Sequence, residues 1–232
     1  MHNLDVLVGM EATRFQYQYS SGTGSSYAND VVETLNASAN GTTSTITSSR
    51  RDNASTSYFA RVNYNYKSKY LLNVSVRRDG SSIFGPENRW GTFPAASLGW
   101  RFSEENFMKG IPSLSEAKLR VSYGLSGNNA FQSGGSPDYY PYAATLRSDN
   151  YSFNNNLANG LAPGTLGNAN LGWEKNQQFD AGIDLGLFNN RIYLIVDYYN
   201  RITKDLLLSV NVPSLTGFTS AVKNIGKMEN KG

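Results

Sequence analysis

The sequence of 232 residues is long enough for one domain with a sizeable core, and 21 Lys and Arg against 18 Asp and Glu give a formal net charge of +3. These charges are scattered and form no basic run, which argues against a nucleic-acid partner. The absence of cysteine excludes a disulfide scaffold and a cysteine-based metal or redox site.

The distribution of apolar residues along the chain excludes membrane-spanning helices but is compatible with the strands of a membrane barrel. No segment approaches the roughly 20 apolar residues that a membrane helix requires. Strands of an outer-membrane barrel alternate apolar and polar residues, so a low mean hydropathy is compatible with them. Met1-His2-Asn3 provides neither the basic start nor the apolar region of a secretory leader, so we expect no signal peptide in these residues.

Period-two alternation of apolar and polar residues recurs along the chain, and this pattern predicts strands. In the first segment, for example, Leu4, Val6 and Val8 alternate with polar or small residues. The segments that alternate in this way are 4–13, 58–66, 70–77, 96–103, 118–124, 178–187 and 191–199. A weaker eighth strand is predicted from Thr219 to Lys227.

The predicted connections alternate between long and short. The longer ones are about 19–52, 79–90, 128–171 and 205–217, and the shorter ones are 67–69, about 104–114, and 189–190. Longer connections therefore fall mainly at one end of the strands. This asymmetry is typical of outer-membrane barrels, which have long extracellular loops and short periplasmic turns.

Aromatic side chains flank the short turns, as in the girdles of membrane barrels. Tyr66 and Tyr70 border the first short turn, Trp100 and Phe102 approach the second, and Phe188 borders the third. A soluble β-sandwich also has alternating strands, but long strands with a polar second face fit a barrel with a water-filled or plugged lumen better.

Short motifs in a consistent order carry a resemblance to a known family. They are Arg78-Asp79-Gly80-Ser81-Ser82, Arg89-Trp90-Gly91, Phe93-Pro94, Gly99-Trp100-Arg101, Ser103-Glu104-Glu105, Ser122-Tyr123-Gly124, Trp173-Glu174, Asp197-Tyr198-Tyr199, Asp205-Leu206-Leu207 and Asn224-Ile225-Gly226. Together they resemble the barrel of SusC/RagA-type TonB-linked outer-membrane proteins, and the resemblance covers nearly the whole chain.

The resemblance implies an all-β fold: an antiparallel transmembrane β-barrel segment, about eight strands of a larger barrel of the 22-stranded class. Residues 1–232 would be a partial barrel domain without the plug, ending in a turn at 230–232. The family's function would be import of oligosaccharides or peptides across the outer membrane of a Gram-negative, Bacteroidetes-like bacterium. The implied partners are outer-membrane lipids, a SusD-like lipoprotein, TonB through the plug, and the glycan or peptide substrate.

No residue set indicates catalysis, a cofactor or a metal site. The single histidine, His2, is terminal, so histidine-based triads and metal sites are not expected. The adjacent Glu104 and Glu105 in a predicted turn are expected to be solvated. We therefore predict that the chain is not an enzyme.

Four loop tyrosines are the candidate ligand or partner contacts, because aromatic rings can stack on sugars or cover a partner protein. They are Tyr139, Tyr140, Tyr142 and Tyr151. Ordinary loop packing is the alternative, and it is the favoured one. On the polar strand face, Gly99, Gly124, Gly182 and Gly186 are expected either to admit a plug or neighbouring side chain or to let the strands bend.

Two other architectures remain open on the sequence. A complete small eight-stranded barrel, acting as an adhesin or anchor, requires the strand at 4–12 to pair with the one at 219–227. A soluble β-sandwich binding module requires a shared buried core. Its members would be Val74, Leu98, Trp100, Leu119 and Ile183.

Overall fold

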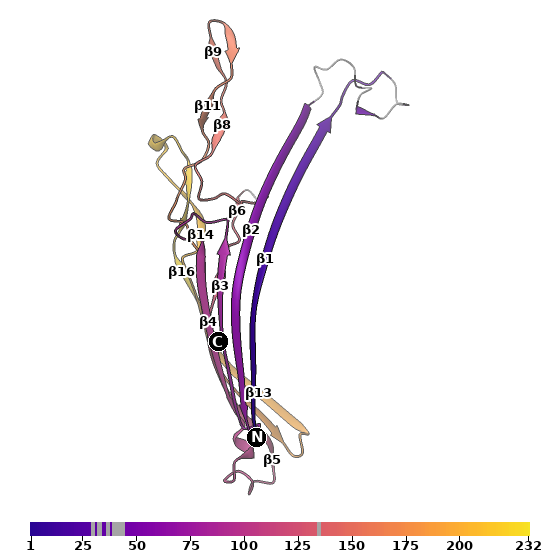
Figure 1. The fold of residues 1–232 in the computed structure, drawn as a ribbon, viewed down its shortest axis with the longest axis vertical. Coiled ribbons are helices and arrows are strands. Elements are labelled where there is room, and N and C mark those ends of the chain that lie inside the picture. The colour runs from indigo at the N-terminus through magenta and orange to yellow at the C-terminus, as the bar shows by residue number, and fades with distance from the viewer. Residues whose placement is uncertain (29–30, 32–33, 36–37, 39–44, 134–135) are drawn as a thin grey trace.

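One antiparallel sheet dominates the structure, a computed structural model that describes residues 1–28, 31, 34–35, 38, 45–133 and 136–232. Eight strands follow one another in the order β1-β2-β3-β4-β5-β12-β13-β16, each beside the previous long strand in the chain. Figure 1 shows them as a tall, curved wall. Their bounds are β1 (His2–Thr23), β2 (Thr45–Tyr66), β3 (Tyr70–Ser81), β4 (Trp90–Trp100), β5 (Leu114–Asn128), β12 (Glu174–Leu187), β13 (Ile192–Lys204) and β16 (Lys227–Lys231).

Short elements decorate the connections between these strands. A 3-10 turn, η2 (Phe102–Glu104), follows β4, and another, η3 (Ser214–Thr216), precedes β15. The long connection between β5 and β12 contains β6 (Gln132–Ser133), β7 (Ser136–Pro137), β8 (Leu146–Ser148), β9 (Tyr151–Phe153), β10 (Asn156–Ala158) and β11 (Leu161–Pro163). β14 (Leu207–Asn211) and β15 (Ser220–Asn224) form a separate hairpin. In the described residues no helix is long and apolar enough to cross a membrane.

The register of the ladders gives the sheet two different faces. Residues directly opposite each other on neighbouring strands share a face, and successive residues alternate between faces. One row across the apolar face is Leu4, Tyr64, Leu72, Leu98, Val121, Ala181 and Tyr198. The adjacent row across the polar face is Asp5, Asn63, Asn73, Ser97, Ser122 and Asp180. The predicted alternation is therefore confirmed.

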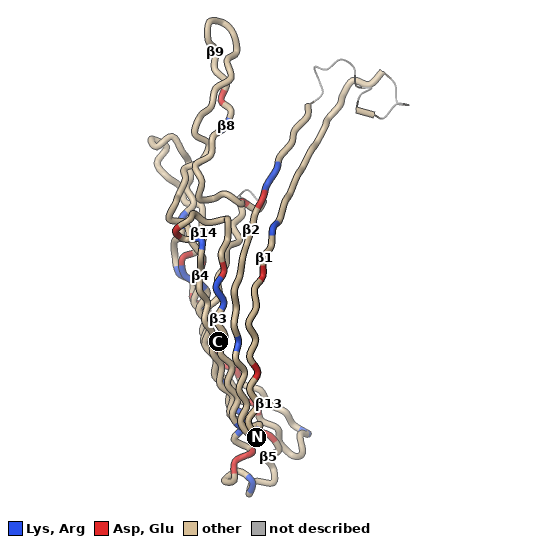
Figure 2. Tube along the Cα trace, viewed as in Figure 1, with Lys and Arg blue, Asp and Glu red and all other residues tan. Residues whose placement is uncertain are grey.

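The apolar face has the height of a membrane's hydrocarbon core. Along β13, Ile192, Leu194, Val196, Tyr198 and Ile202 share this face, with the polar Asn200 between the last two. From Ile192 to Ile202 the strand advances ten residues, which is about 33 Å at ~3.3 Å per residue. At the usual tilt of barrel strands this length spans about 25 Å, the height of the apolar band of outer-membrane barrels. Figure 2 shows few charges along the lower strands and more at the turns and upper ends.

The first connection is much shorter than the sequence predicted. Residues 19–52 were expected to form a loop, but β1 runs to Thr23 and β2 begins at Thr45. Unbroken pairing from His2↔Tyr66 to Thr23↔Thr45 extends the hairpin well above the neighbouring strands, as Figure 1 shows. The alternation continues in Phe15 and Tyr17, which lie beyond the predicted strand, and in Tyr19, which lies in the predicted loop. Part of the remaining connection lies outside the described residues.

The eighth strand was also misplaced. The segment predicted from Thr219 to Lys227 contains β15, which pairs with β14 and not with the main sheet. Gly226, with a φ of +88°, lies between this hairpin and β16. β16 then pairs with β13. Lys231 at the predicted final turn is a strand residue opposite Asn200. The polar composition of β16 explains why its alternation was not recognised.

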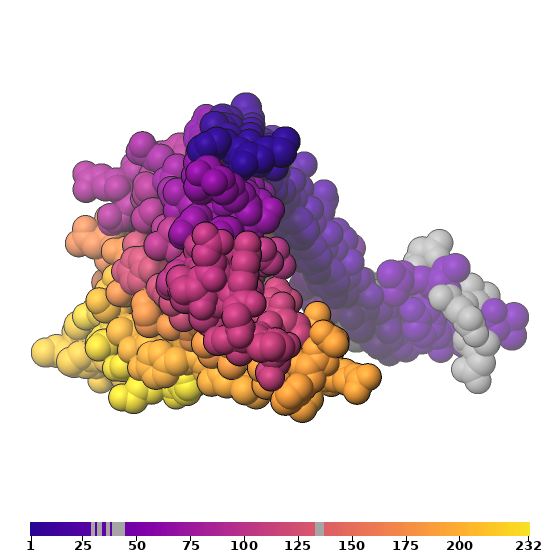
Figure 3. Space-filling view, turned by 90° about the horizontal axis from the view of Figure 1, so that it is seen from below, coloured from indigo at the N-terminus to yellow at the C-terminus, as the bar shows by residue number. Residues whose placement is uncertain are grey.

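Neither alternative architecture fits the sheet. In the described residues β1 pairs only with β2, and β16 only with β13, so the sheet is open and does not close as a small barrel. Figure 3, seen from the end with the short turns, shows the colours passing across the molecule in strand order. The predicted sandwich core is absent, because Leu98 is 61% exposed and Val74 and Leu119 are over 40% exposed.

The buried core lies in the loops rather than in the sheet. Ile83, Phe84, Phe131, Leu171 and Leu207 form a buried cluster contributed by three different connections. We call this set the loop core. Tyr139, Tyr142, Trp173 and Val222 pack around it. The long connections therefore form a packed cap at one end of the wall.

Candidate functional site

The polar face of the sheet contains a hollow of about 440 Å³. Amide and carboxylate groups cross it from strand to strand: the Asn63 side-chain amide donates to Asp5 at 3.1 Å, and Asn73 donates to Asn63. On the neighbouring strands the Ser122 hydroxyl donates to Asp180 at 3.1 Å. Such a face suits contact with water or with another polar surface better than contact with lipid.

Arg120 is the centre of the strongest ion pairs on this face. Its Nε and Nη2 donate to the Asp184 carboxylate at 2.8–3.0 Å, and Nη2 also reaches Asp197 at 2.9 Å. The Asp184 side chain is only 11% exposed, whereas Arg120 is 37% and Asp197 49% exposed. The guanidinium thus joins β5, β12 and β13, and it neutralises Asp184, the more buried of the two carboxylates.

Gly182 makes room for this arrangement. It lies between Arg120 and Asp197 in the register, and a Cβ placed on it would collide with Asp197 and approach Arg120 Nη2 at 2.9 Å. Gly124 similarly faces the Cβ of Ala95 at 3.1 Å. Close approach of a neighbouring side chain, one of the two predicted roles, therefore applies to Gly182.

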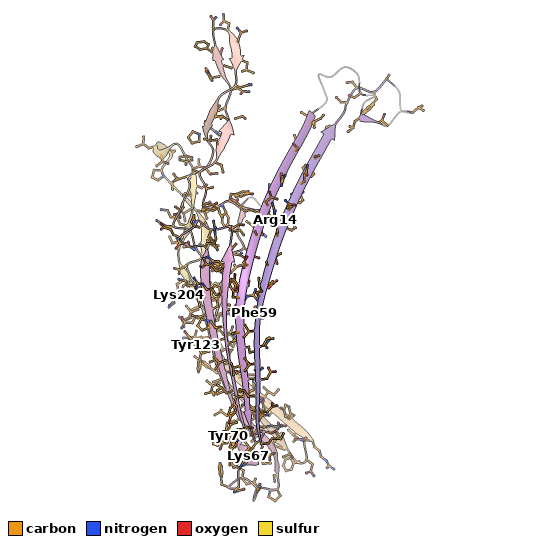
Figure 4. The ribbon with its side chains drawn as sticks, in the orientation of Figure 1. Arg14, Phe59, Lys67, Tyr70, Tyr123 and Lys204 are labelled. Carbon is orange, nitrogen blue, oxygen red and sulfur yellow. The ribbon has the colours of Figure 1, made fainter. Side chains whose placement is uncertain are left out.

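Phenyl rings cover other glycines on the polar face. Phe59 lies over Gly9, and Phe93 lies beside Gly91. A ring laid over a glycine replaces the packing that the missing side chain would provide. Figure 4 shows Phe59 midway along the wall, below Arg14 on the β1–β2 hairpin.

Glu105 corrects the prediction that the adjacent glutamates are simply solvated. Its carboxylate accepts hydrogen bonds from the Tyr70 hydroxyl at 2.7 Å, Lys69 Nζ at 3.3 Å and the Trp100 indole at 3.5 Å, and its side chain is only 18% exposed. These donors stabilise the charged form, Tyr70 most strongly, so the pKa of Glu105 lies below its ordinary value. The glutamate joins the short turn 67–69 to the connection after β4.

In the upper part of the β1–β2 hairpin, the apolar side chains change to the opposite face of the sheet. Below, the apolar residues of β1 are at even positions, such as Val6 and Val8. Above, the aromatic residues Phe15, Tyr17 and Tyr19 are at odd positions, so they continue the polar face. The opposite face there carries Arg14, Gln16 and Gln18. This reversal is expected where a strand leaves lipid and both faces meet water.

These aromatic residues line a cleft of about 450 Å³ against the cap, which we call the aromatic cleft. Its lining is Phe15, Tyr17, Tyr19, Ser49, Arg51, Pro137 and Tyr139. Phe15 and Tyr139 lie with ring centroids 6.0 Å apart, and Arg51 Nη1 donates to the Pro137 carbonyl at 3.1 Å. The three strand aromatics are each nearly half exposed, so their ring faces are available to a ligand.

The four predicted tyrosines do not form one site. Tyr139 lines the aromatic cleft, and Tyr140 fixes the cap to β2 through hydrogen bonds between its hydroxyl and the Asp52 backbone at 3.1 and 3.3 Å. Tyr142 packs against the loop core. Tyr151 is exposed on the distal β9–β10 hairpin beside Phe153. The alternation of Phe15, Tyr17 and Tyr19 could have revealed the rest of the cleft.

No metal-binding cluster is present among the described residues, since no three His, Cys, Asp or Glu side chains lie close enough to hold an ion. The geometry offers ring faces, amides and charges for non-covalent contact.

Known proteins match this chain over nearly its whole length. Residues 2–232 match the family model "TonB dependent receptor-like, beta-barrel". The chain is 42% identical over its full length to TonB-dependent receptor P39 of Formosa agariphila, of which it covers 21%. It is 41% identical over 182 residues to TonB-dependent receptor SusC of Bacteroides thetaiotaomicron, covering 78% of this chain and 18% of SusC.

A solved structure agrees in detail. The chain superposes on the RagAB peptide transporter with a TM-score of 0.88 and 32% identity, covering 100% of this chain and 25% of that one. The chain therefore spans about a fifth to a quarter of the length of these relatives. The match to part of a large barrel agrees with the open sheet described above.

The family consists of outer-membrane transporters of Gram-negative bacteria rather than enzymes, and its strands face lipid on one side. The two-faced sheet, its apolar height and the family match over residues 2–232 agree: the chain belongs to the TonB-dependent receptor-like β-barrel family and is of the SusC/RagA type.

Proposed function

We propose that this chain supplies wall strands and part of the extracellular mouth of an importer for oligosaccharides or peptides. The observation that carries the proposal is the match of the entire chain to a solved peptide transporter at a TM-score of 0.88. Import by the whole receptor would be energised by TonB through a plug inside the barrel. In this proposal residues 1–232 contribute barrel domain, and the polar face with its hollow is turned toward the lumen.

The aromatic cleft is the proposed place of cargo contact in this chain. Tyr17, Tyr19 and Tyr139 present ring faces that suit stacking on sugars or on peptide side chains, and Arg51 supplies a nearby cation. The cleft lies on the continuation of the polar face, above the apolar band, so a ligand there is on the way into the lumen. Tyr140 and Tyr142 act by holding the cap in place.

The distal hairpin is the proposed contact for a SusD-like lipoprotein that covers the mouth. Tyr151, Phe153, Leu157 and Leu161 are each more than half exposed on β9–β11. An apolar group of this kind raised above the wall is unfavourable in water and is typical of a protein interface. Figure 1 shows this hairpin standing above the rest of the cap.

The experiment is an uptake and binding assay with the full-length receptor and its lipoprotein partner. Candidate glycans and peptides are screened first, and Tyr17→Ala and Tyr139→Ala are then tested on the cargo found. We expect each variant to weaken binding by about tenfold, corresponding to ~1.4 kcal/mol. Tyr123→Ala is the matched control, because Tyr123 is 45% exposed against 44% for Tyr17 but lies on the apolar face. Cargo uptake that does not depend on TonB would contradict the importer proposal.

A further inference from the structure

Three lysines lie directly opposite one another on the apolar side of the sheet. Lys175 on β12 pairs with Lys204 on β13, and Lys204 pairs with Lys227 on β16. The alternation of β13 places Lys204 on the same face as Val196 and Ile202. We call the three residues the lysine row. All three are exposed.

Such a row is unfavourable by itself. Side chains directly opposite each other on neighbouring strands have Cβ atoms about 4.5–5.5 Å apart, and like charges at that distance repel. Lys175 reaches Asp205 at 3.5 Å and Lys227 reaches Glu229 at 3.9 Å, but these pairs are largely exposed and so weak. Lys204, between them, has no ion-pair partner among the described residues.

The row's height in the membrane indicates what could neutralise it. Immediately below it on the same face come Gln177, Ile202 and Glu229, and then Phe179, Asn200 and Lys231. The apolar band begins with the next row, which contains Ala181 and Tyr198. Figure 4 shows Lys204 well above Tyr70 and Lys67 and slightly above Phe59, on the side toward the end of the wall that carries the long connections. In outer-membrane barrels that end is extracellular. The lysines therefore lie where the apolar band meets the headgroups of the outer leaflet.

A second cation lies on the same face of the wall, on β3. Arg78 is six residues above Leu72, just as Lys204 is six residues above Tyr198, and Leu72 and Tyr198 belong to one row across the sheet. Arg78 stands opposite Tyr58 and Thr92, and its guanidinium lies 5.4 Å from the centroid of the Trp90 ring, which stacks near Tyr58. A cation over an interfacial indole is typical of the boundary between lipid and water. This arrangement supports the position assigned to the lysine row.

We propose that the lysine row binds the phosphate groups of an anionic glycolipid in the outer leaflet. Three ammonium groups on flexible stems can converge on one phosphate while their methylene chains remain against the apolar face. The bound phosphate removes the repulsion between the opposed lysines. The inference concerns the lipid-facing surface and does not depend on which cargo the receptor imports.

Native mass spectrometry of the full-length receptor, with purified lipid A as the probe, tests the proposal. The wild type should bind phosphorylated lipid A at least tenfold more tightly than dephosphorylated lipid A with the same acyl chains. The triple variant Lys175→Gln, Lys204→Gln, Lys227→Gln should lose this preference. Lys67→Gln, which removes an exposed lysine beside Tyr66 at the opposite end of the strands, should keep it. Equal binding of both lipids by the wild type, or an unchanged preference in the triple variant, would overturn the proposal.

A thermal measurement separates lipid binding from a merely structural lysine. In a neutral detergent without lipid A, Lys204→Gln should raise the melting temperature of the receptor, because the repulsion is relieved. Addition of lipid A should raise the melting temperature of the wild type by more than that of the variant. A lower melting temperature for Lys204→Gln in neutral detergent, or equal shifts on addition of lipid A, would contradict the lysine row as a phosphate site.

Discussion

The wall and the cap of this molecule are stabilised in opposite ways. The wall has a continuous hydrogen-bond ladder but no buried apolar core of its own: Leu98 is 61% exposed. The cap has short, irregular strands but a buried core, in which Phe84 and Leu171 are fully covered. The wall is thus built to receive its apolar environment from lipid, whereas the cap buries its apolar residues within itself. A substitution should therefore change the free energy of unfolding by different amounts in the two regions.

The largest effect is expected in the loop core. Phe84→Ala removes a fully buried ring, and it should destabilise the cap by about 3–5 kcal/mol because it leaves a cavity. Hydrogen exchange of the connections 129–173 and 205–226 in the full-length receptor measures this loss. Leu98→Ala on the wall is the control and should leave exchange in the cap unchanged. Equal exchange in the two variants would remove the distinction between wall and cap.

A charge on the apolar face of the wall should come next. Leu98→Arg should cost about 2–4 kcal/mol in a lipid bilayer, because it places a charge in hydrocarbon. Ser97→Arg, one residue away on the polar face, should cost less than about 1 kcal/mol. Denaturant unfolding of receptor reconstituted in vesicles compares the two. Similar costs would mean that the faces are not assigned correctly.

The ion pairs of the polar face should have a smaller effect. Arg120→Met leaves the Asp184 carboxylate without its cation, and the expected loss is about 1–3 kcal/mol, reduced from the value for fully buried pairs by the exposure of the guanidinium. Adding Asp184→Leu to Arg120→Met should recover part of the loss. A double-mutant cycle on denaturant unfolding measures this coupling, and strictly additive costs would contradict it.

The smallest effect is the pH dependence at the lower turns. Because its donors hold the folded-state pKa of Glu105 below the ordinary 4.5, its carboxylate stabilises the fold above pH 4.5. This stabilisation is lost as the pH falls through the depressed pKa. Melting curves of the wild type and Glu105→Gln should therefore differ at neutral pH and converge in acid. A difference that grows as the pH falls would show the opposite sign.

The sequence predicted the wall much better than the cap. Alternation in segments such as 70–77 and 191–199 assigned strands and faces correctly, because a period of two is a local property of the chain. The resemblance motifs supplied the family. Pairing of β14 with β15 and the displacement of the eighth strand to Lys227–Lys231 could not be seen, because both depend on contacts between distant residues.

The candidate site was predicted only in part. Tyr139 was identified, but Tyr19 was assigned to a loop, and Phe15 and Tyr17 were assigned to no element. The apolar phase of these three residues is reversed relative to Leu4 and Val6. The surroundings of Glu105 depend on Tyr70, 35 residues away in the sequence. Contacts of this kind depend on how the strands are paired, and the amino-acid composition does not reveal that pairing.

The most direct test of the account is a scan of lipid accessibility along one strand of the full-length receptor in a bilayer. Single spin-labelled cysteines are placed in turn at positions 71–77 of β3. Collision with oxygen, which is concentrated in lipid, should be high at Leu72, Val74 and Val76 and low at Asn73 and Ser75. Collision with a water-soluble relaxing agent should show the reverse pattern. Accessibility without a period of two, or low oxygen access at every position, would contradict a lipid-facing wall.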